Sequence, residues 1–167
     1  MNDHDGADGE AVMRVALPSK DMVLQACAGT VAIPHLVLQA AYELASLHEA
    51  RLDLTADFHA IDHERARLVS RIDGWVNAEK PSASGAAYLH TETVGMVIDR
   101  LAQFSVDARP ISGPNAPTLR LVYAQHRLTQ LAFAYGDLAF EVAAGARRLP
   151  DFSFPLDGEG AGQRPSG

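Results

Sequence analysis

Apolar residues recur at intervals of three and four along most of the chain, and charged residues fill the positions between them. This spacing is typical of α-helices that bury one face. No Asn-Gly or Asp-Gly turn separates alternating apolar runs in the body, so the sequence gives no strand signal. The pattern predicts a short first helix at about 20–28, a second that begins after Ile33, and three more at about 57–78, 92–108 and 118–148.

Small polar residues, glycine and proline mark where these helices should begin and end. Ser19, Thr55 and Thr91 are the predicted N-caps of the first, third and fourth helices. The remaining signals are Gly29 as the stop of the first helix, Pro34 in the first turn of the second, Glu92 in the first turn of the fourth, Arg147 and Arg148 in the last turn of the fifth, and Pro150 as its stop.

The fifth predicted helix carries two sets of residues that repeat every seven positions, which is the pattern of a packed seam between helices. One set is Leu121, Leu128, Tyr135 and Val142, and the other is Ala124, Leu131, Leu138 and Gly145. We therefore expect an all-α fold, an up-down bundle of four main helices with a short leading helix.

Length and charge define the expected domain organisation. The chain has 167 residues and a net charge of −7, a size that suits one domain. The acidic surplus lies mostly at the ends, so the body is close to neutral. We expect a disordered acidic N-terminus at 1–15, a helical bundle domain at 16–150 and a flexible Gly/Pro-rich tail at 151–167. A chain without a basic patch is not expected to bind nucleic acid or an anionic membrane.

Cysteine content and hydropathy indicate the compartment. Cys27 is the single cysteine, the N-terminus is acidic where a secretory signal is basic and then apolar, and no apolar run is long enough to span a bilayer. These features predict a cytoplasmic protein. The sequence has no glycine-rich phosphate loop and no G-x-S-x-G turn, so it carries no recognisable catalytic signature, and we predict no cofactor.

Arg65 is the first of three patterns that could carry chemistry. It lies inside the apolar stripe of the third predicted helix, four residues after Ile61, where an unpaired charge is costly. Arg65 should therefore pair with Asp62, Asp99 or Glu141. Such a contact can be a buried ion-pair network that fixes helix register, or part of a binding site.

The second pattern is a polar cluster at the start of the fourth helix, where the backbone N–H groups attract anions. A helix cap with surrounding surface charges explains the same residues. The cluster contains His90, Thr91, Glu92, Asp99 and Arg100.

The third pattern is a pair of histidines, His59 and His63, four residues apart on one helix face. This spacing can hold a metal ion, but Ala60 stands where the zinc proteases have glutamate, and a third ligand would have to come from elsewhere. We predict no metal site and keep the two histidines as the weak candidates.

Several of these polar positions also resemble the domain-of-unknown-function 4254 family of small bacterial proteins, over about 44–149. The motifs are Ile61-Asp62-x-x-Arg65 with Leu68-Val69-x-x-Ile72-Asp73, His90-Thr91-Glu92-Thr93, Ile98-Asp99-Arg100-Leu101, Asp137-Leu138, and Glu141-x-x-Ala144-Gly145-x-Arg147. The resemblance implies a helical protein with no established activity, and relatives in surface-polysaccharide gene contexts. It also adds Glu141 and Arg147 to a common polar cluster built from the third, fourth and fifth helices.

Three functions remain open at this stage. The first is a non-enzymatic interaction or accessory protein, expected to form a homodimer or bind a protein partner. The second is an enzyme or small-ligand binder that uses the cluster of Asp, Arg, His and Glu residues, with a link to surface-polysaccharide metabolism. The third is a bundle that binds metal through histidine and carboxylate ligands.

Overall fold

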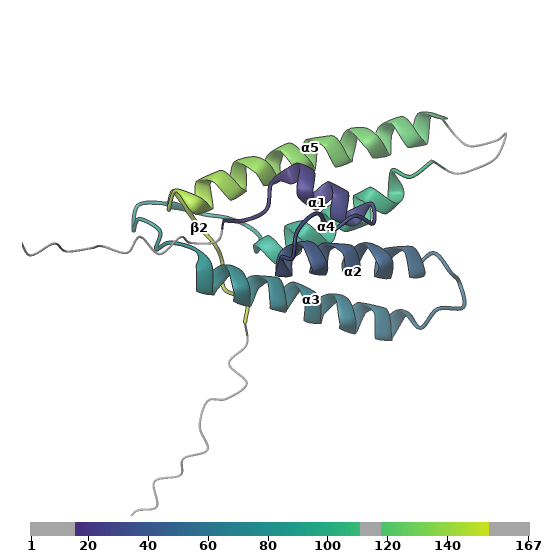
Figure 1. The fold of residues 1–167 in the computed structure, drawn as a ribbon, viewed down its shortest axis with the longest axis horizontal. Helices are drawn as coiled ribbons and strands as arrows, with labels where there is room; N and C mark the ends of the chain where they lie inside the picture. Colours follow the sequence, from purple (N-terminus) through teal and green to yellow (C-terminus); the bar gives the residue numbers. More distant parts are fainter. Residues whose placement is uncertain (1–15, 111–117, 154–167) are drawn as a thin grey trace, which may run out of the picture.

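The computed structural model describes residues 16–110 and 118–153, which form five helices and one short strand pair (Figure 1). The all-α bundle predicted from the sequence is confirmed. The predicted N-terminal segment at 1–15 and residues 154–167 of the predicted tail lie outside the described residues. The elements are α1 (Lys20–Cys27), α2 (Leu36–Ala50), α3 (Phe58–Glu79), β1 (Tyr88–Leu89), α4 (Val94–Asp107), α5 (Thr118–Ala143) and β2 (Arg147–Arg148).

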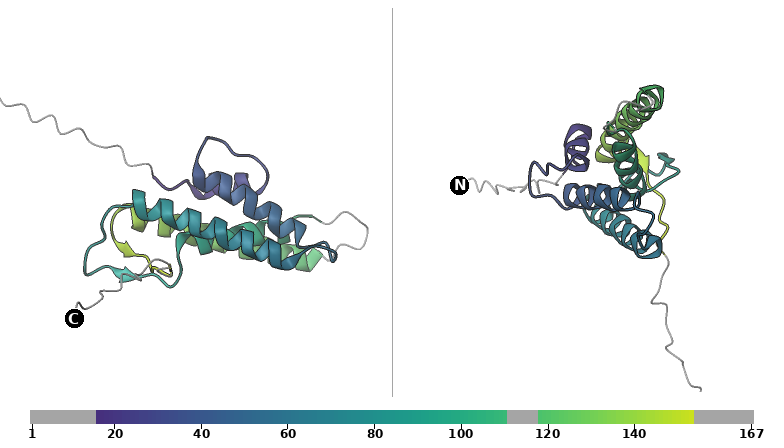
Figure 2. Two further views of the ribbon diagram at one scale, coloured as in Figure 1. Left: turned by 90° about the horizontal axis from the view of Figure 1, so that it is seen from below. Right: turned by 90° about the vertical axis from the view of Figure 1, so that its right-hand side faces the viewer.

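The helix α4 is the centre of the bundle, because it contacts each of the other four helices. The helices α2 and α3 run antiparallel on one side of it, and α5 lies on the other side (Figures 1 and 2). The short α1 packs against α2, α4 and α5. Because α5 contacts neither α2 nor α3, one long side of α5 has no neighbour within the described residues.

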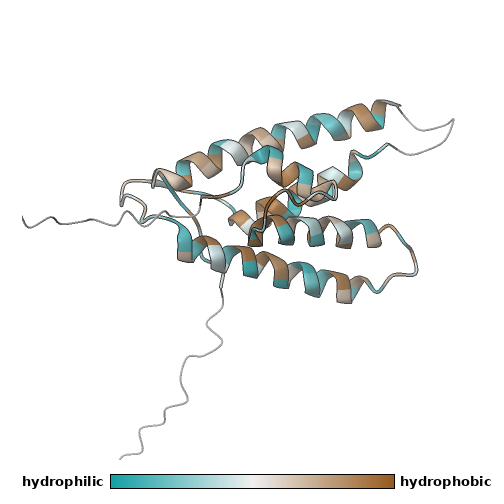
Figure 3. Ribbon diagram, viewed as in Figure 1, coloured by the Kyte–Doolittle hydropathy of each residue, from teal (hydrophilic) through white to brown (hydrophobic). Residues whose placement is uncertain are grey.

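The core is built from the apolar stripes of these helices, and polar residues occupy much of the outer faces of α2, α3 and α4 (Figure 3). Its largest fully buried side chains include Leu44, Leu68, Ile98 and Tyr135. The Tyr135 hydroxyl donates a hydrogen bond of 2.8 Å to the backbone oxygen of Pro18, which ties the segment before α1 to α5. No helix in the described parts of the chain has the length and apolar character needed to cross a bilayer.

The helix ends agree with the sequence prediction to within one residue at α1 and differ elsewhere by up to five residues. Ser19 caps α1 by accepting a hydrogen bond from the backbone N–H of Met22 at 3.3 Å, and Gly29 follows the helix with a positive φ of 106°. The predicted place of Pro34 in the first turn of the second helix is wrong. Pro34 precedes the N-cap, which is His35.

The predicted caps Thr55 and Thr91 are also wrong. Asp57 caps α3 by accepting from the backbone N–H of Ala60 at 3.0 Å, while Thr55 donates its hydroxyl to Asp53. Thr93 caps α4 by accepting from Met96, so Glu92 lies before the helix and outside its first turn. In each case the true cap is the polar residue two positions closer to the helix.

The fifth helix is shorter than predicted. It ends at Ala143, because Gly145 turns the backbone with a positive φ of 67°, so the stop predicted at Pro150 is wrong. Arg147 and Arg148 are not in its last turn. They form β2, which pairs in parallel with β1, Tyr88 opposite Arg147 and Leu89 opposite Arg148. This pair, absent from the sequence prediction, joins the loop after α3 to the end of the bundle.

Candidate functional site

Arg65 pairs with two of the three carboxylates that the sequence offered. Its guanidinium donates two hydrogen bonds to Asp99 of α4, from Nη2 to Oδ2 at 2.6 Å and from Nε to Oδ1 at 3.2 Å. A third hydrogen bond of 2.9 Å runs from Nη1 to Asp62 on the preceding turn of α3. The guanidinium therefore joins α3 to α4 with the two-pronged geometry that makes Arg–carboxylate pairs strong.

His48 and Arg51 extend this contact to α2, and the sequence analysis did not place either in the cluster. His48 is only 6% exposed, and its Nε2 lies 2.8 Å from Oδ1 of Asp99. Arg51, just after α2, pairs with Asp62. The sequence feature that could have identified His48 is its place on the otherwise apolar stripe of α2, where a polar side chain needs a partner. A chain of ion pairs thus runs from Arg51 through Asp62 and Arg65 to Asp99, and the hydrogen bond with His48 continues it into α2.

The charges in this network support one another. Burial acts to raise the pKa of Asp99, but the hydrogen bonds from His48 and Arg65 outweigh burial and hold the pKa below its usual value. The hydrogen bonds that Arg65 donates to Asp99 raise the pKa of Arg65 in turn. Since the Asp99 carboxylate receives three contacts, the network holds α2, α3 and α4 in register through one charged centre.

The other predicted cluster residues form separate contacts. Glu92 pairs with Arg100, two turns along α4, and Glu141 accepts a hydrogen bond of 2.7 Å from Nε of Arg147. That hydrogen bond lowers the pKa of Glu141, and nearby His90 adds a smaller effect in the same direction. Thr91 is exposed. The structure therefore brings together Asp62, Arg65 and Asp99, then Glu92 and Arg100, and then His90, Glu141 and Arg147.

The predicted anion-binding start of α4 is occupied by a carboxylate of the chain itself. Asp73 of α3 accepts a hydrogen bond of 2.7 Å from the backbone N–H of Gly95. Burial raises the pKa of Asp73, and the hydrogen bonds from Gly95 and Thr93 oppose this effect. Asp73 therefore fills the position that an external anion would take.

His59 and His63 are both exposed on the first turns of α3. Within the described residues, no three histidine, cysteine, aspartate or glutamate side chains are grouped closely enough to hold a metal ion. A metal site built on these histidines therefore finds no third ligand in the described residues.

The ion-pair network and Asp73 lie in the part of the chain that matches a known family. Residues 38–111 match the model of a family described as protein of unknown function (DUF4254). The resemblance predicted from the sequence is thereby confirmed over this range, which runs from α2 to just beyond α4. No curated protein and no solved structure is significantly similar to the chain.

The DUF4254 match includes every member of the network that links α2, α3 and α4, and it ends before α5 begins. The predicted continuation of the resemblance to Leu149, with Glu141 and Arg147, stays a prediction. The helix α5 thus adds to the DUF4254 region a long element with features of its own.

The outward side of α5 carries exposed apolar residues at helical spacing. Phe133 and Phe140 are 58% and 76% exposed, and Leu119 is 83% exposed. With His126, these residues repeat every seven positions, so they share one face of the helix. We call this surface the α5 outer face, and it consists of Leu119, Val122, Tyr123, His126, Phe133 and Phe140.

Proposed function

We propose that this chain is a non-enzymatic interaction protein that forms a homodimer through the α5 outer face. The observation that carries the proposal is the group of large exposed apolar residues on one face of that helix, two at its middle and end and three at its start, with His126 between them. Large apolar patches with polar rims on soluble domains are typical of protein contact sites. We further propose that it acts in the bacterial cytoplasm as an accessory protein, because the charged residues that could have formed a catalytic site are mostly engaged with one another.

The geometry of α5 favours a helix partner. Leu119 and Phe140 are separated by three seven-residue repeats, or about 31 Å along the helix axis. This is the minimum length over which such repeats are typical of a helix pair. The seam residues on the opposite side of α5 already pack on α1 and α4, so a partner meets a helix that is held in place.

The charges at the two ends of the face favour a second copy in antiparallel orientation. Arg120 is exposed near the start of α5 and Asp137 near its end, and neither forms an ion pair with a described residue. A two-fold axis near the middle of the helix places Leu119 opposite Phe140 of the second copy. The same axis places the end of α5 that carries Arg120 alongside the end that carries Asp137 of that copy, whereas a parallel pair would bring ends of like charge together.

The oligomeric state tests the proposal directly. Sedimentation equilibrium at micromolar concentration should give the mass of a dimer. Phe133→Glu or Phe140→Glu should give a monomer with an unchanged helical circular dichroism spectrum, because a charge on the face must be desolvated on association. Leu54→Glu is the matched control. Leu54 is 90% exposed in the turn between α2 and α3, away from the face, so this variant should remain a dimer.

The proposed dimer is contradicted if the wild-type chain stays monomeric at about 100 µM. At this concentration even a dimer with a dissociation constant of tens of micromolar would be detected. A dimer that Phe133→Glu and Phe140→Glu leave intact contradicts the assignment to α5.

Charge reversal tests the antiparallel orientation. Arg120→Glu and Asp137→Arg should each weaken the dimer several-fold, and the double variant should recover most of the affinity, because the reversed pair is again complementary. If the double variant loses as much affinity as the two single variants together, Arg120 and Asp137 do not face each other. The antiparallel orientation is then wrong, even if the dimer forms through the α5 outer face.

A further inference from the structure

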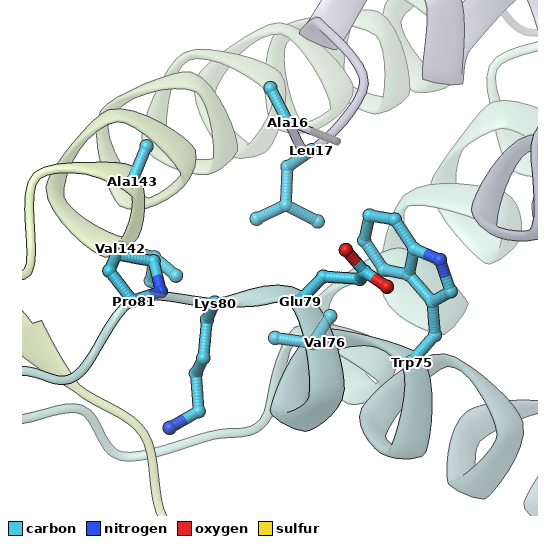
Figure 4. A pocket seen from close by; sticks show the side chains of 9 residues that line it. All are labelled: Ala16, Leu17, Trp75, Val76, Glu79, Lys80, Pro81, Val142 and Ala143. Atoms are coloured by element: carbon cyan, nitrogen blue, oxygen red, sulfur yellow. The ribbon is translucent and has the colours of Figure 1, made fainter. Parts of the chain in front are cut away.

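A cavity of about 260 Å³ lies where the end of α3 and the end of α5 meet the segment before α1 (Figure 4). Most of its wall is apolar, with Leu17, Val76 and Val142 around the centre and Pro81 at one side. This volume is slightly below the usual range of ligand pockets, about 300–1,000 Å³, so it suits a compact ligand. The cavity is separate from the ion-pair network and from the α5 outer face.

Trp75 and Glu79 give the cavity an electrostatic character. Both project from the last turns of α3, and Figure 4 shows the Glu79 carboxylate directed toward the Trp75 ring. Glu79 has no hydrogen bond or ion pair with a described side chain that could neutralise it. Lys80 also lines the cavity, but its ammonium group points away from Trp75 (Figure 4).

The position of Glu79 in the helix strengthens this character. Glu79 is the last residue of α3, where the helix dipole already places partial negative charge. A carboxylate at this end is unfavourable unless a cation lies nearby. The face of an indole ring also attracts cations. Three sources of negative potential therefore converge on one apolar cavity.

We propose that this cavity binds a small organic ammonium ion with a compact apolar body. The ammonium group would lie between the Glu79 carboxylate and the Trp75 ring, and the apolar body would pack against Leu17, Val76 and Val142. The indole is already held in place, since its ring contacts His35 edge to face with centroids 4.8 Å apart. A ligand would thus meet a wall that needs little ordering.

Titration with cyclohexylmethylammonium tests the proposal, because Trp75 is the only tryptophan of the chain and its emission reports on this cavity. Isothermal calorimetry on the full chain provides the affinity. We expect saturable heat together with a change in Trp75 emission, and binding about tenfold tighter than that of cyclohexylmethanol, because a charge-assisted hydrogen bond replaces a neutral one. Cyclohexanecarboxylate should not bind.

Two variants assign the preference to a side chain. Glu79→Gln keeps the shape of the side chain and removes its charge, so the ammonium ion and the alcohol should then bind with similar affinity. Lys80→Gln is the matched control, because it removes the neighbouring charge, and the preference for the ammonium ion should survive. The proposal is overturned if the full chain shows no saturable binding, if the alcohol binds as tightly as the ammonium ion, or if Glu79→Gln retains the preference.

Discussion

Gly95 lies where the backbone of α4 approaches the backbone of α3 closely. A Cβ atom built there would lie 2.5 Å from the backbone oxygen of Val69 and 2.9 Å from Oδ1 of Asp73. Because the first of these atoms belongs to a helix backbone, it cannot move without shifting α3. The small size of Gly95 therefore sets the distance between the two helices and lets Asp73 reach the start of α4.

Gly95→Ala should destabilise the fold by about 3 kcal/mol, the upper range for overpacking a well-packed site. Gly74→Ala is the control within the same helix pair. A Cβ atom at Gly74 meets nothing within 4 Å, so alanine should stabilise α3 by about 0.5–1 kcal/mol. Urea denaturation of both variants measures the two effects. Equal stabilities for them would show that the close contact at Gly95 is not limiting.

Substitutions of Asp73 can show whether its hydrogen bond or its charge matters for stability. Its pKa is raised by burial, so its charged form is penalised at neutral pH even though it accepts the hydrogen bond from Gly95. Asp73→Asn keeps an acceptor oxygen and removes the buried charge, so it should match or exceed the wild-type melting temperature at pH 7. Asp73→Ala leaves the backbone N–H of Gly95 without a partner and should cost about 1–3 kcal/mol. An asparagine variant as unstable as the alanine variant would show that the charge itself is needed.

At the scale of single elements, the sequence predicted which segments are helical better than where they begin. The apolar spacing located all five helices because each buries one stripe in the core. The caps were displaced because several polar residues precede each helix and any of them can cap it in isolation. Tertiary contacts decide among them. Thr93, for example, lies beside Asp73 of α3, and that neighbour is not visible in a local sequence window.

The contact that Arg65 makes between α3 and α4 gives the strongest prediction about how the helices are held together. Arg65→Met should destabilise the fold by about 2–3 kcal/mol, because it leaves the Asp99 carboxylate with one partner fewer in a half-buried site. Arg67→Met is the control on the same helix. Arg67 pairs with Glu64 on the surface, and its loss should change stability by less than about 0.5 kcal/mol.

Chemical denaturation followed by circular dichroism gives both values. If the two arginine variants are equally stable, the Arg65 contact does not hold the helices in register. If Arg65→Met is as stable as Arg67→Met, Arg65 is not needed for folding, and a role of the network in binding is then favoured.

At the scale of the whole molecule, the sequence correctly flagged Arg65 because a charge on an apolar stripe needs a partner. It could not separate the polar residues into distinct groups, since their distances depend on where each helix crosses its neighbours. The pairing of Arg147 with Glu141 also depends on the turn at Gly145, which ends α5 five residues earlier than predicted. The spacing of apolar residues alone does not show whether a glycine adopts a left-handed conformation that ends the helix or continues the helix.

The stability of the whole molecule should fall as the pH decreases from 7.5 to 5.5, and His35 is the expected cause. Its Nδ1 accepts a hydrogen bond of 3.1 Å from the backbone N–H of Val37 at the start of α2, and its ring packs on Trp75 of α3. Burial lowers the pKa of His35, and the smaller opposing effect of the Ala16 backbone does not reverse this. The unfolded chain therefore binds the proton more readily than the folded chain, so stability is full above about pH 6.5 and declines below it.

Thermal unfolding at half-unit pH steps measures this decline. His35→Asn should remove most of it, because asparagine caps a helix well and does not titrate, although the lost ring contact lowers the whole curve. His63→Asn, at an exposed position of α3, should follow the wild-type slope. Asp99 does not contribute to the decline, since its lowered pKa keeps its stabilisation until the pH falls toward 3.8. Asp73, whose pKa is raised, acts in the opposite direction, because its protonation at lower pH removes a penalised charge. Parallel curves for the wild type and His35→Asn would assign the decline to another group.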